Sequence, residues 1–96
     1  MSTEITIDDQ PDASRYIAHD AGGAQLGYLT YEPRGEGVVA FTHTVTDPAA
    51  QGRGVASSLV RRAIADARQR GQRIVPVCSF VGGWLDKHPE EKDVVA

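Results

Sequence analysis

Cysteine, aromatic residues and long hydrophobic runs are all scarce in this chain of 96 residues. With Cys78 as its single cysteine the chain cannot form an internal disulfide, which favours a reducing compartment. No apolar stretch approaches the ~20 residues that cross a bilayer, and the polar start lacks the apolar core of a signal peptide. The formal net charge of −3 argues against general binding to nucleic acid. We therefore expect a cytoplasmic protein that stays outside the membrane.

Length and composition are those of one globular domain, which we expect to span residues 1–96. The hydrophobic fraction of 41% and the charged fraction of 24% are ordinary for a globular protein, and a second core would not fit. No His, Cys, Asp or Glu residues show the close spacing of a metal site, so we expect no metal. The sequence leaves open whether the protein is a monomer or a weak homodimer.

Short segments typical of strands fill the first half of the chain, and a long amphipathic helix follows them. Turn residues between the first strands are typical of antiparallel hairpins. Apolar residues then recur at every third or fourth position from Val55 to Ala67, and Gly71 ends the helix. Residues 4–7 are open to two interpretations, a short strand or a mobile segment. The expected strands span residues 15–19, 24–32, 38–46 and 73–78, with the helix between the last two.

A helix that connects two strands of one sheet makes those strands parallel by a right-handed crossover. Pro76 cannot donate a backbone hydrogen bond, which favours an edge position or a bulge for the last strand. We expect a short helix over residues 79–88 and a charged tail after it. Within the long helix, Arg62–Asp66 and Asp66–Arg70 are expected to form ion pairs between residues four positions apart. The fold class is α+β: an antiparallel β-meander, a crossover helix, a parallel strand and a short C-terminal helix.

A glycine-bearing turn, Gln51-Gly52-Arg53-Gly54-Val55-Ala56, opens the long helix. Helix N-termini carry unpaired N–H groups and a positive dipole end, so this turn is a candidate site for phosphate or pyrophosphate. It lacks the lysine of a Walker P-loop and the third glycine of a dinucleotide fingerprint. It does satisfy the pattern Gln/Arg-x-x-Gly-x-Gly/Ala, between a strand with an Asp47-Pro48 loop and a helix.

With these features the chain resembles the GNAT superfamily of acetyl-CoA-dependent N-acetyltransferases, and in particular its small single-domain members. The resemblance rests on FTHTVTDPAAQGRGVASSLV, on Val75-Pro76-Val77-Cys78-Ser79-Phe80-Val81, and on Trp84-Leu85 and His88-Pro89-Glu90. It implies a minimal GNAT core that binds acetyl-CoA. The coenzyme's pyrophosphate would contact Gln51, Gly52, Arg53, Gly54, Val55 and Ala56, with hydroxyl contacts from Ser57 or Ser58. The pantetheine arm would pair with Thr44, Val45 and Thr46.

The resemblance also implies two candidate catalytic residues. His43 lies beside the expected coenzyme edge and is the candidate general base; the alternative is a structural histidine. Cys78 is the candidate nucleophile or proton donor to the leaving thiolate; the alternative is a small buried hydrophobic residue. For Arg53, the alternative to a phosphate contact is a solvated surface arginine. We interpret His19 and His88 as structural or surface residues.

The chain is much shorter than ordinary GNAT enzymes, so we expect an open acceptor face, suited to a protein amine or a polyamine. Three functions follow in order. The first is an acetyl-CoA-dependent N-acetyltransferase with an unidentified amine acceptor, either a protein or a small amine. The second is a non-catalytic acetyl-CoA-binding module that regulates a partner. The third is a nucleic-acid adaptor that uses the arginines of the helix.

Overall fold

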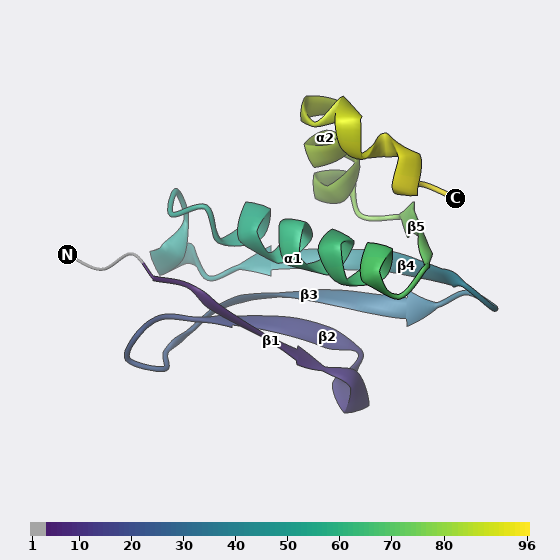
Figure 1. The fold of residues 1–96 in the computed structure, drawn as a ribbon. Coiled ribbons are helices and arrows are strands. Elements are labelled where there is room, and N and C mark those ends of the chain that lie inside the picture. Colours follow the sequence, from purple (N-terminus) through teal and green to yellow (C-terminus); the bar gives the residue numbers. More distant parts are fainter. Residues whose placement is uncertain (1–3) are drawn as a thin grey trace.

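A five-stranded sheet with helices packed against it forms the protein (Figure 1), in a computed structural model that describes residues 4–96. The strands lie in the order of the chain and are antiparallel except for the last pair, β4 and β5, which are parallel. This confirms the predicted fold class and the edge position of Pro76. The strands are β1 Thr6–Gln10, β2 Arg15–His19, β3 Gln25–Pro33, β4 Val38–Thr46 and β5 Arg73–Pro76.

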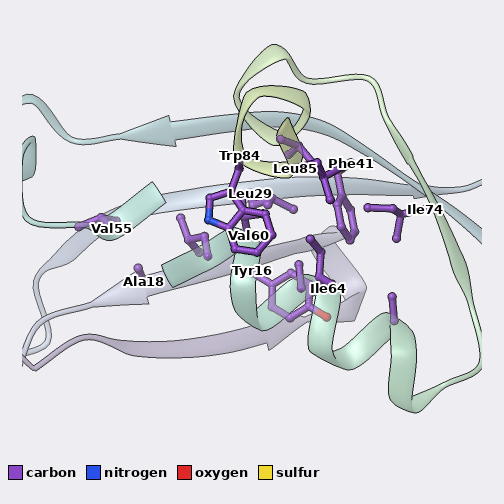
Figure 2. Packing of buried hydrophobic residues seen from close by; sticks show 14 of the residues in the cluster. Tyr16, Ala18, Leu29, Phe41, Val55, Val60, Ile64, Ile74, Trp84 and Leu85 are labelled. Carbon is purple, nitrogen blue, oxygen red and sulfur yellow. The ribbon is translucent and has the colours of Figure 1, made fainter. Parts of the chain in front are cut away.

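Helix α1 (Val55–Gln69) crosses over from β4 to β5, and α2 (Ser79–Lys87) follows β5. The apolar stripe of α1 packs on the sheet beside Trp84 and Leu85 of α2, so that both helices contribute to one hydrophobic core (Figure 2). Burial of these side chains supplies the main driving force for the fold. In the part of the chain described here, no helix is long and apolar enough to span a membrane. Three short 3-10 helices lie between or after these elements, at Pro11–Ala13, Pro48–Ala50 and Pro89–Val94.

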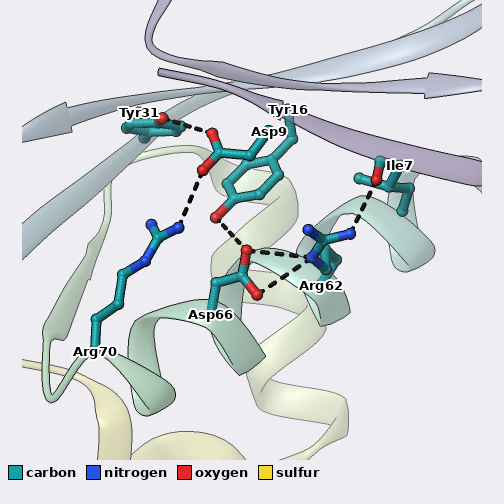
Figure 3. Close-up of polar contacts among 7 residues, drawn as sticks. All are labelled: Ile7, Asp9, Tyr16, Tyr31, Arg62, Asp66 and Arg70. Atoms are coloured by element: carbon teal, nitrogen blue, oxygen red, sulfur yellow. Dashed lines mark hydrogen bonds and ion pairs between the residues drawn. The ribbon is translucent and has the colours of Figure 1, made fainter.

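Of the two interpretations of residues 4–7, the structure shows a strand, but one that begins at Thr6 and continues to Gln10, because its position depends on distant contacts rather than on local pattern. It runs over Thr6–Gln10 and includes two aspartates, which are unfavourable in strands. Asp9 accepts hydrogen bonds from Tyr31 (2.7 Å) and Arg70 (3.1 Å), and Arg62 donates to the Ile7 carbonyl (2.9 Å; Figure 3). These contacts attach β1 to β3 and α1.

The same contacts determine which of the two predicted ion pairs within α1 form. Arg62 and Asp66 pair at 3.2 Å as predicted, and the Tyr16 hydroxyl also donates to Asp66 at 2.9 Å. The predicted Asp66–Arg70 pair is wrong: the Arg70 guanidinium lies against Asp9 of β1 instead. That carboxylate is only 14% exposed, so pairing it offsets a larger desolvation cost than an exposed pair would.

The chain end was predicted as a charged tail, and this is wrong for the segment up to Val95. Residues Pro89–Val94 form a 3-10 helix with Val94 buried in the core. Arg68 of α1 pairs with Glu91 (2.8 Å) and Asp93 (2.6 Å), so the charges of the segment bind the helix instead of facing only water. Val95 forms a parallel bridge with Ile74, which covers part of the outer edge of β5.

Candidate functional site

The candidate site begins where β4 and β5 part. Their parallel pairing covers Val38–Phe41 of β4 and ends at Pro76 of β5. The Val77 N–H then turns back to the Val75 carbonyl, and the Cys78 N–H donates to the Phe41 carbonyl at 3.0 Å. From residue 42 to 46, β4 continues with β3 on one side and no strand of residues 4–96 on the other. Its backbone there can pair with an extended ligand that carries amides.

An irregularity in β4 lies at the same point. His43 pairs with Thr30 and Phe41 with Tyr31, so Thr42 is an extra residue between two paired positions, which defines a β-bulge. The Thr42 and Thr30 hydroxyls share a hydrogen bond of 2.6 Å. The bulge therefore coincides with the end of the β4–β5 pairing.

The glycine turn has a left-handed backbone conformation at both of its glycines. Gly52 and Gly54 have φ of +83° and +77°, a region that side chains disfavour, while an added Cβ would meet nothing within 4 Å at either position. The two glycines are thus required by backbone conformation rather than by crowding. Within residues 4–96, the N–H groups of Gly52, Gly54 and residues 55–57 have no hydrogen-bond acceptor. Free N–H groups at the positive end of a helix dipole are suitable donors for an anion, so this turn is a candidate anion-binding site.

A cleft of about 410 Å³ joins this turn to the open edge of β4. Thr44 and Thr46 of β4 face the cleft, and Phe80 of α2, which is 40% exposed, forms its other wall. Gly27 of β3 lies close against β4 and the start of α1, and any Cβ there would collide with the Val45 carbonyl oxygen. The residues that line the cleft are Thr44, Thr46, Ala50, Gln51, Gly52, Gly54, Val55, Ala56, Ser57 and Phe80.

Cys78 lies beside this cleft at the N-terminus of α2 and is half-buried. Its sulfur is hydrogen-bonded to the Thr44 hydroxyl at 3.5 Å. Burial alone raises the pKa of the thiol, but hydrogen bonds with the Thr44 hydroxyl and with the backbone at Val81, Phe80 and Thr44 outweigh this effect. The net effect is a lowered pKa, so a larger fraction of the thiol is ionised at neutral pH than in an ordinary cysteine.

His43 and Val45 lie on the opposite face of β4. Both are exposed, and they stand opposite Thr30 and Tyr28 of β3. Because side chains alternate along a strand, Thr44 and Cys78 lie on one side of β4 and the His43 ring on the other. The structure therefore brings Cys78, Thr44 and Thr46 together and does not bring the side chains of His43 or Val45 into the cleft.

The remaining predicted residues differ in their contacts. Arg53 is exposed in the turn, and no carboxylate of residues 4–96 pairs with it. The Ser58 hydroxyl donates to the Gly54 carbonyl at 2.9 Å, so it closes the first turn of α1, whereas Ser57 lines the cleft. Ala50 and Phe80 line the cleft without having been predicted. The sequence gave no reason to place Phe80 at the cleft, because its position there depends on how α2 packs.

This arrangement has the parts that acyl transfer from a pyrophosphate-linked thioester needs. The turn can bind a pyrophosphate, the open strand edge can pair with an amide-containing arm, and a thiol of lowered pKa contacts Thr44, which lines the cleft. Each part comes from a different element, and the crossover of α1 joins them.

Comparisons with known proteins agree with this geometry. Residues 15–94 match the family described as GCN5-related N-acetyl-transferase. No curated protein matches the chain. A GCN5-like protein of Staphylococcus aureus, solved by NMR, is 25% identical with a TM-score of 0.66, covering 100% of this chain and 91% of that one.

Two solved structures of other proteins that contain coenzyme A are similar to this chain in fold alone. A GNAT family N-acetyltransferase of Escherichia coli in complex with CoA is 18% identical with a TM-score of 0.59, over 74% of this chain and 59% of that one. N-acetylglutamate synthase of Neisseria gonorrhoeae, complexed with coenzyme A and N-acetyl-glutamate, is 16% identical with a TM-score of 0.61, over 93% of this chain and 26% of that one. The family match covers most of the sequence and the fold agrees along the whole chain, so this protein belongs to the GCN5-related N-acetyl-transferase family.

Proposed function

We propose that this protein transfers the acetyl group of acetyl-CoA to an amine. The observation that carries the proposal is the continuity of the cleft, in which free N–H groups of the glycine turn and the open edge of β4 share one space. The pyrophosphate, pantetheine arm and thioester of acetyl-CoA follow one another in the order turn, edge and Cys78. Residues 51–57 would bind the pyrophosphate, and Thr44, Val45 and Thr46 would pair with pantetheine through their backbone.

Two routes for the acetyl group use the candidate residues. In direct transfer, the amine nitrogen attacks the thioester carbonyl as His43 takes its proton, the C–S bond breaks, and Cys78 protonates the departing thiolate. In the stepwise route, the Cys78 thiolate attacks the thioester carbonyl and coenzyme A leaves as thiolate, which takes a proton from solvent. The amine then attacks the acetyl-cysteine, loses a proton to solvent, and releases the Cys78 thiolate. The lowered pKa of Cys78 supports the stepwise route.

The acceptor would be a protein amine, a polyamine or another small amine, since the face of β4 that carries His43 is open. A nucleophilic thiol must stay reduced, so we propose the cytoplasm as its compartment. The opposite orientations of His43 and Cys78 favour one second candidate, a non-catalytic acetyl-CoA-binding module that regulates a partner.

The turn assignment is tested with a matched pair of glycine variants. Gly54 and Gly35 both have positive φ (+77° and +84°) and open space around an added side chain, so a glutamate costs each similar backbone strain. Only Gly54→Glu puts a carboxylate at the pyrophosphate site, and we expect it to weaken acetyl-CoA binding by at least about tenfold in calorimetry. Gly35→Glu should bind normally. Equal affinity in both variants would contradict the assignment.

Catalysis is tested in the same proteins by release of free thiol from acetyl-CoA in the presence of amines. Cys78→Ala should lower turnover about a hundredfold or more while the affinity for acetyl-CoA changes little. His43→Ala should do so only if the amine reaches the thioester from the face of β4 that carries the imidazole. If neither changes thiol release with any acceptor, the binding module is the better description.

A further inference from the structure

The side chains that line the coenzyme cleft do not titrate near neutral pH. The lining consists of glycine, alanine, valine and phenylalanine residues together with Thr44, Thr46, Ser57 and Gln51. The hydroxyls and the amide among them can form hydrogen bonds, but they cannot take a proton as a general base does. Within residues 4–96, the lining of this cleft therefore supplies no general base.

Cys78 has surroundings of the same kind. Its sulfur contacts the Thr44 hydroxyl at 3.5 Å, and the groups that shift its pKa most are burial, this hydroxyl and the backbone rather than a charged side chain. Two exposed hydrophobic residues, Val77 (52%) and Phe80 (40%), lie within two positions of it in the chain. The candidate base, His43, lies on the opposite face of β4. An acetyl group on the Cys78 sulfur would thus have hydroxyl, backbone and apolar neighbours.

Such surroundings suit a thiol better than an amine as the acceptor of that acetyl group. An amine that attacks a carbonyl must lose a proton before it becomes a stable amide, and a positioned base accelerates such steps about 10²–10⁴-fold. A thiol ionises in water and attacks as its thiolate, so no proton has to be removed in the cleft. Thr44 and the start of α2 also stabilise the Cys78 thiolate, which is the group that must then leave.

The cleft can also accept a second thiol. Once coenzyme A has left, the open backbone of β4 from residue 42 to 46 is free to pair with another arm that carries amides. We propose that Cys78 also exchanges the acetyl group between thiols, taking it from acetyl-CoA and passing it to a second thiol whose arm carries amides. This rests on the stepwise route of the proposed function. It adds a class of acceptor to that function, namely small thiols that enter through the coenzyme cleft.

The two steps of this exchange balance without any further reactant. The Cys78 thiolate adds to the thioester carbonyl, the bond between that carbon and the coenzyme sulfur breaks, and coenzyme A leaves as thiolate. The second thiolate then adds to the acetyl-cysteine carbonyl, and the bond to the Cys78 sulfur breaks, which restores the Cys78 thiolate. The proton that the second thiol gives to solvent replaces the one that coenzyme A takes up.

Isotope exchange between acetyl-CoA and deuterium-labelled coenzyme A, with no amine present, tests the proposal by mass spectrometry. The native protein should move acetyl to the labelled coenzyme at least about tenfold faster than Cys78→Ala does, since the variant cannot form the acetyl-cysteine. Calorimetry with coenzyme A should show that the variant keeps its affinity, so that the lost exchange is not a lost fold. If acetyl-CoA binds but exchange is no faster than in Cys78→Ala, this inference alone is overturned. If acetyl-CoA does not bind the native protein, the proposed function fails as well.

Two acceptors of nearly equal shape give a second test that needs no variant. N-acetylcysteamine and N-acetylethylenediamine both carry an amide on a short arm, which ends in a thiol in the first and in an amine in the second. With acetyl-CoA as donor at pH 7, and after subtraction of the rate without protein, the native protein should acetylate the thiol at least about tenfold faster, because the amine finds no general base in the cleft. Equal rates, or a faster amine, would overturn the assignment of thiols as acceptors.

Discussion

Two neighbouring aspartates of β1 allow a sharp test of what holds this strand to the fold. The Asp9 side chain is 14% exposed and accepts hydrogen bonds from the Tyr31 hydroxyl at 2.7 Å and from Arg70 at 3.1 Å. The Asp8 side chain faces the other way, is 61% exposed, and among residues 4–96 its one ion-pair partner is His19 at 3.5 Å. The same change, aspartate to asparagine, should therefore have different effects at adjacent positions.

The expected size follows from these contacts. A hydrogen bond to a charged acceptor contributes about 1.5–3 kcal/mol, and asparagine keeps an oxygen that can still accept from Tyr31 at the lower, neutral value. Arg70 is 52% exposed, so its ion pair with Asp9 is screened and contributes less than about 1 kcal/mol. We expect Asp9→Asn to lower the free energy of unfolding by about 1–2 kcal/mol, and Asp8→Asn by at most about 0.5 kcal/mol.

Urea unfolding at pH 7 measures both values, and hydrogen exchange shows where the loss occurs. In Asp9→Asn the β1 amides should exchange faster while those of β3 and β4 keep most of their protection, because only β1 depends on this contact. Equal destabilisation by the two variants would refute the reasoning, as would an Asp9→Asn protein whose β1 amides exchange at the native rate.

Two further predictions concern titrating groups. Thr44→Val should raise the pKa of the Cys78 thiol and slow its alkylation by iodoacetamide about threefold or more at neutral pH, whereas Thr46→Val, which lines the cleft without touching the sulfur, should not. Burial and a hydrogen bond to a carboxylate raise the pKa of Tyr31 from 10.0 to about 12. Because the unfolded chain loses this proton first, stability should fall as pH rises from 10 to 12 in urea titrations. Tyr31→Phe should reduce that slope, while Tyr16, whose pKa is also raised by burial, keeps part of it; an unchanged slope would contradict the shift.

Elements whose pattern is local could be predicted from the sequence. The apolar stripe of α1, the glycines before and after it, and the turns between strands all act within a few residues, so element order and fold class follow from them. The glycine turn was predicted for the same reason, since its conformation and its free N–H groups belong to one short segment.

What failed depends on pairs far apart in the chain. Asp9 stabilises β1 only through Tyr31 and Arg70, and the C-terminal segment is ordered because Arg68 binds Glu91 and Asp93. No periodicity marks such pairs. In the site, the orientations of His43 and Cys78 were likewise beyond local pattern, because they depend on how β4, β5 and α2 pack.

The extra residue in β4 bends the strand without changing which face its later side chains occupy. Because Phe41 pairs with Tyr31 and His43 with Thr30, deletion of Thr42 would make these two pairs consecutive and leave both intact. Thr44 would still face Cys78, and His43 would still lie on the opposite face. The deletion would instead remove the local bend and stronger twist at the residue where β4 and β5 part, so the strand edge beyond it would diverge less from β5 and leave less room for an extended ligand.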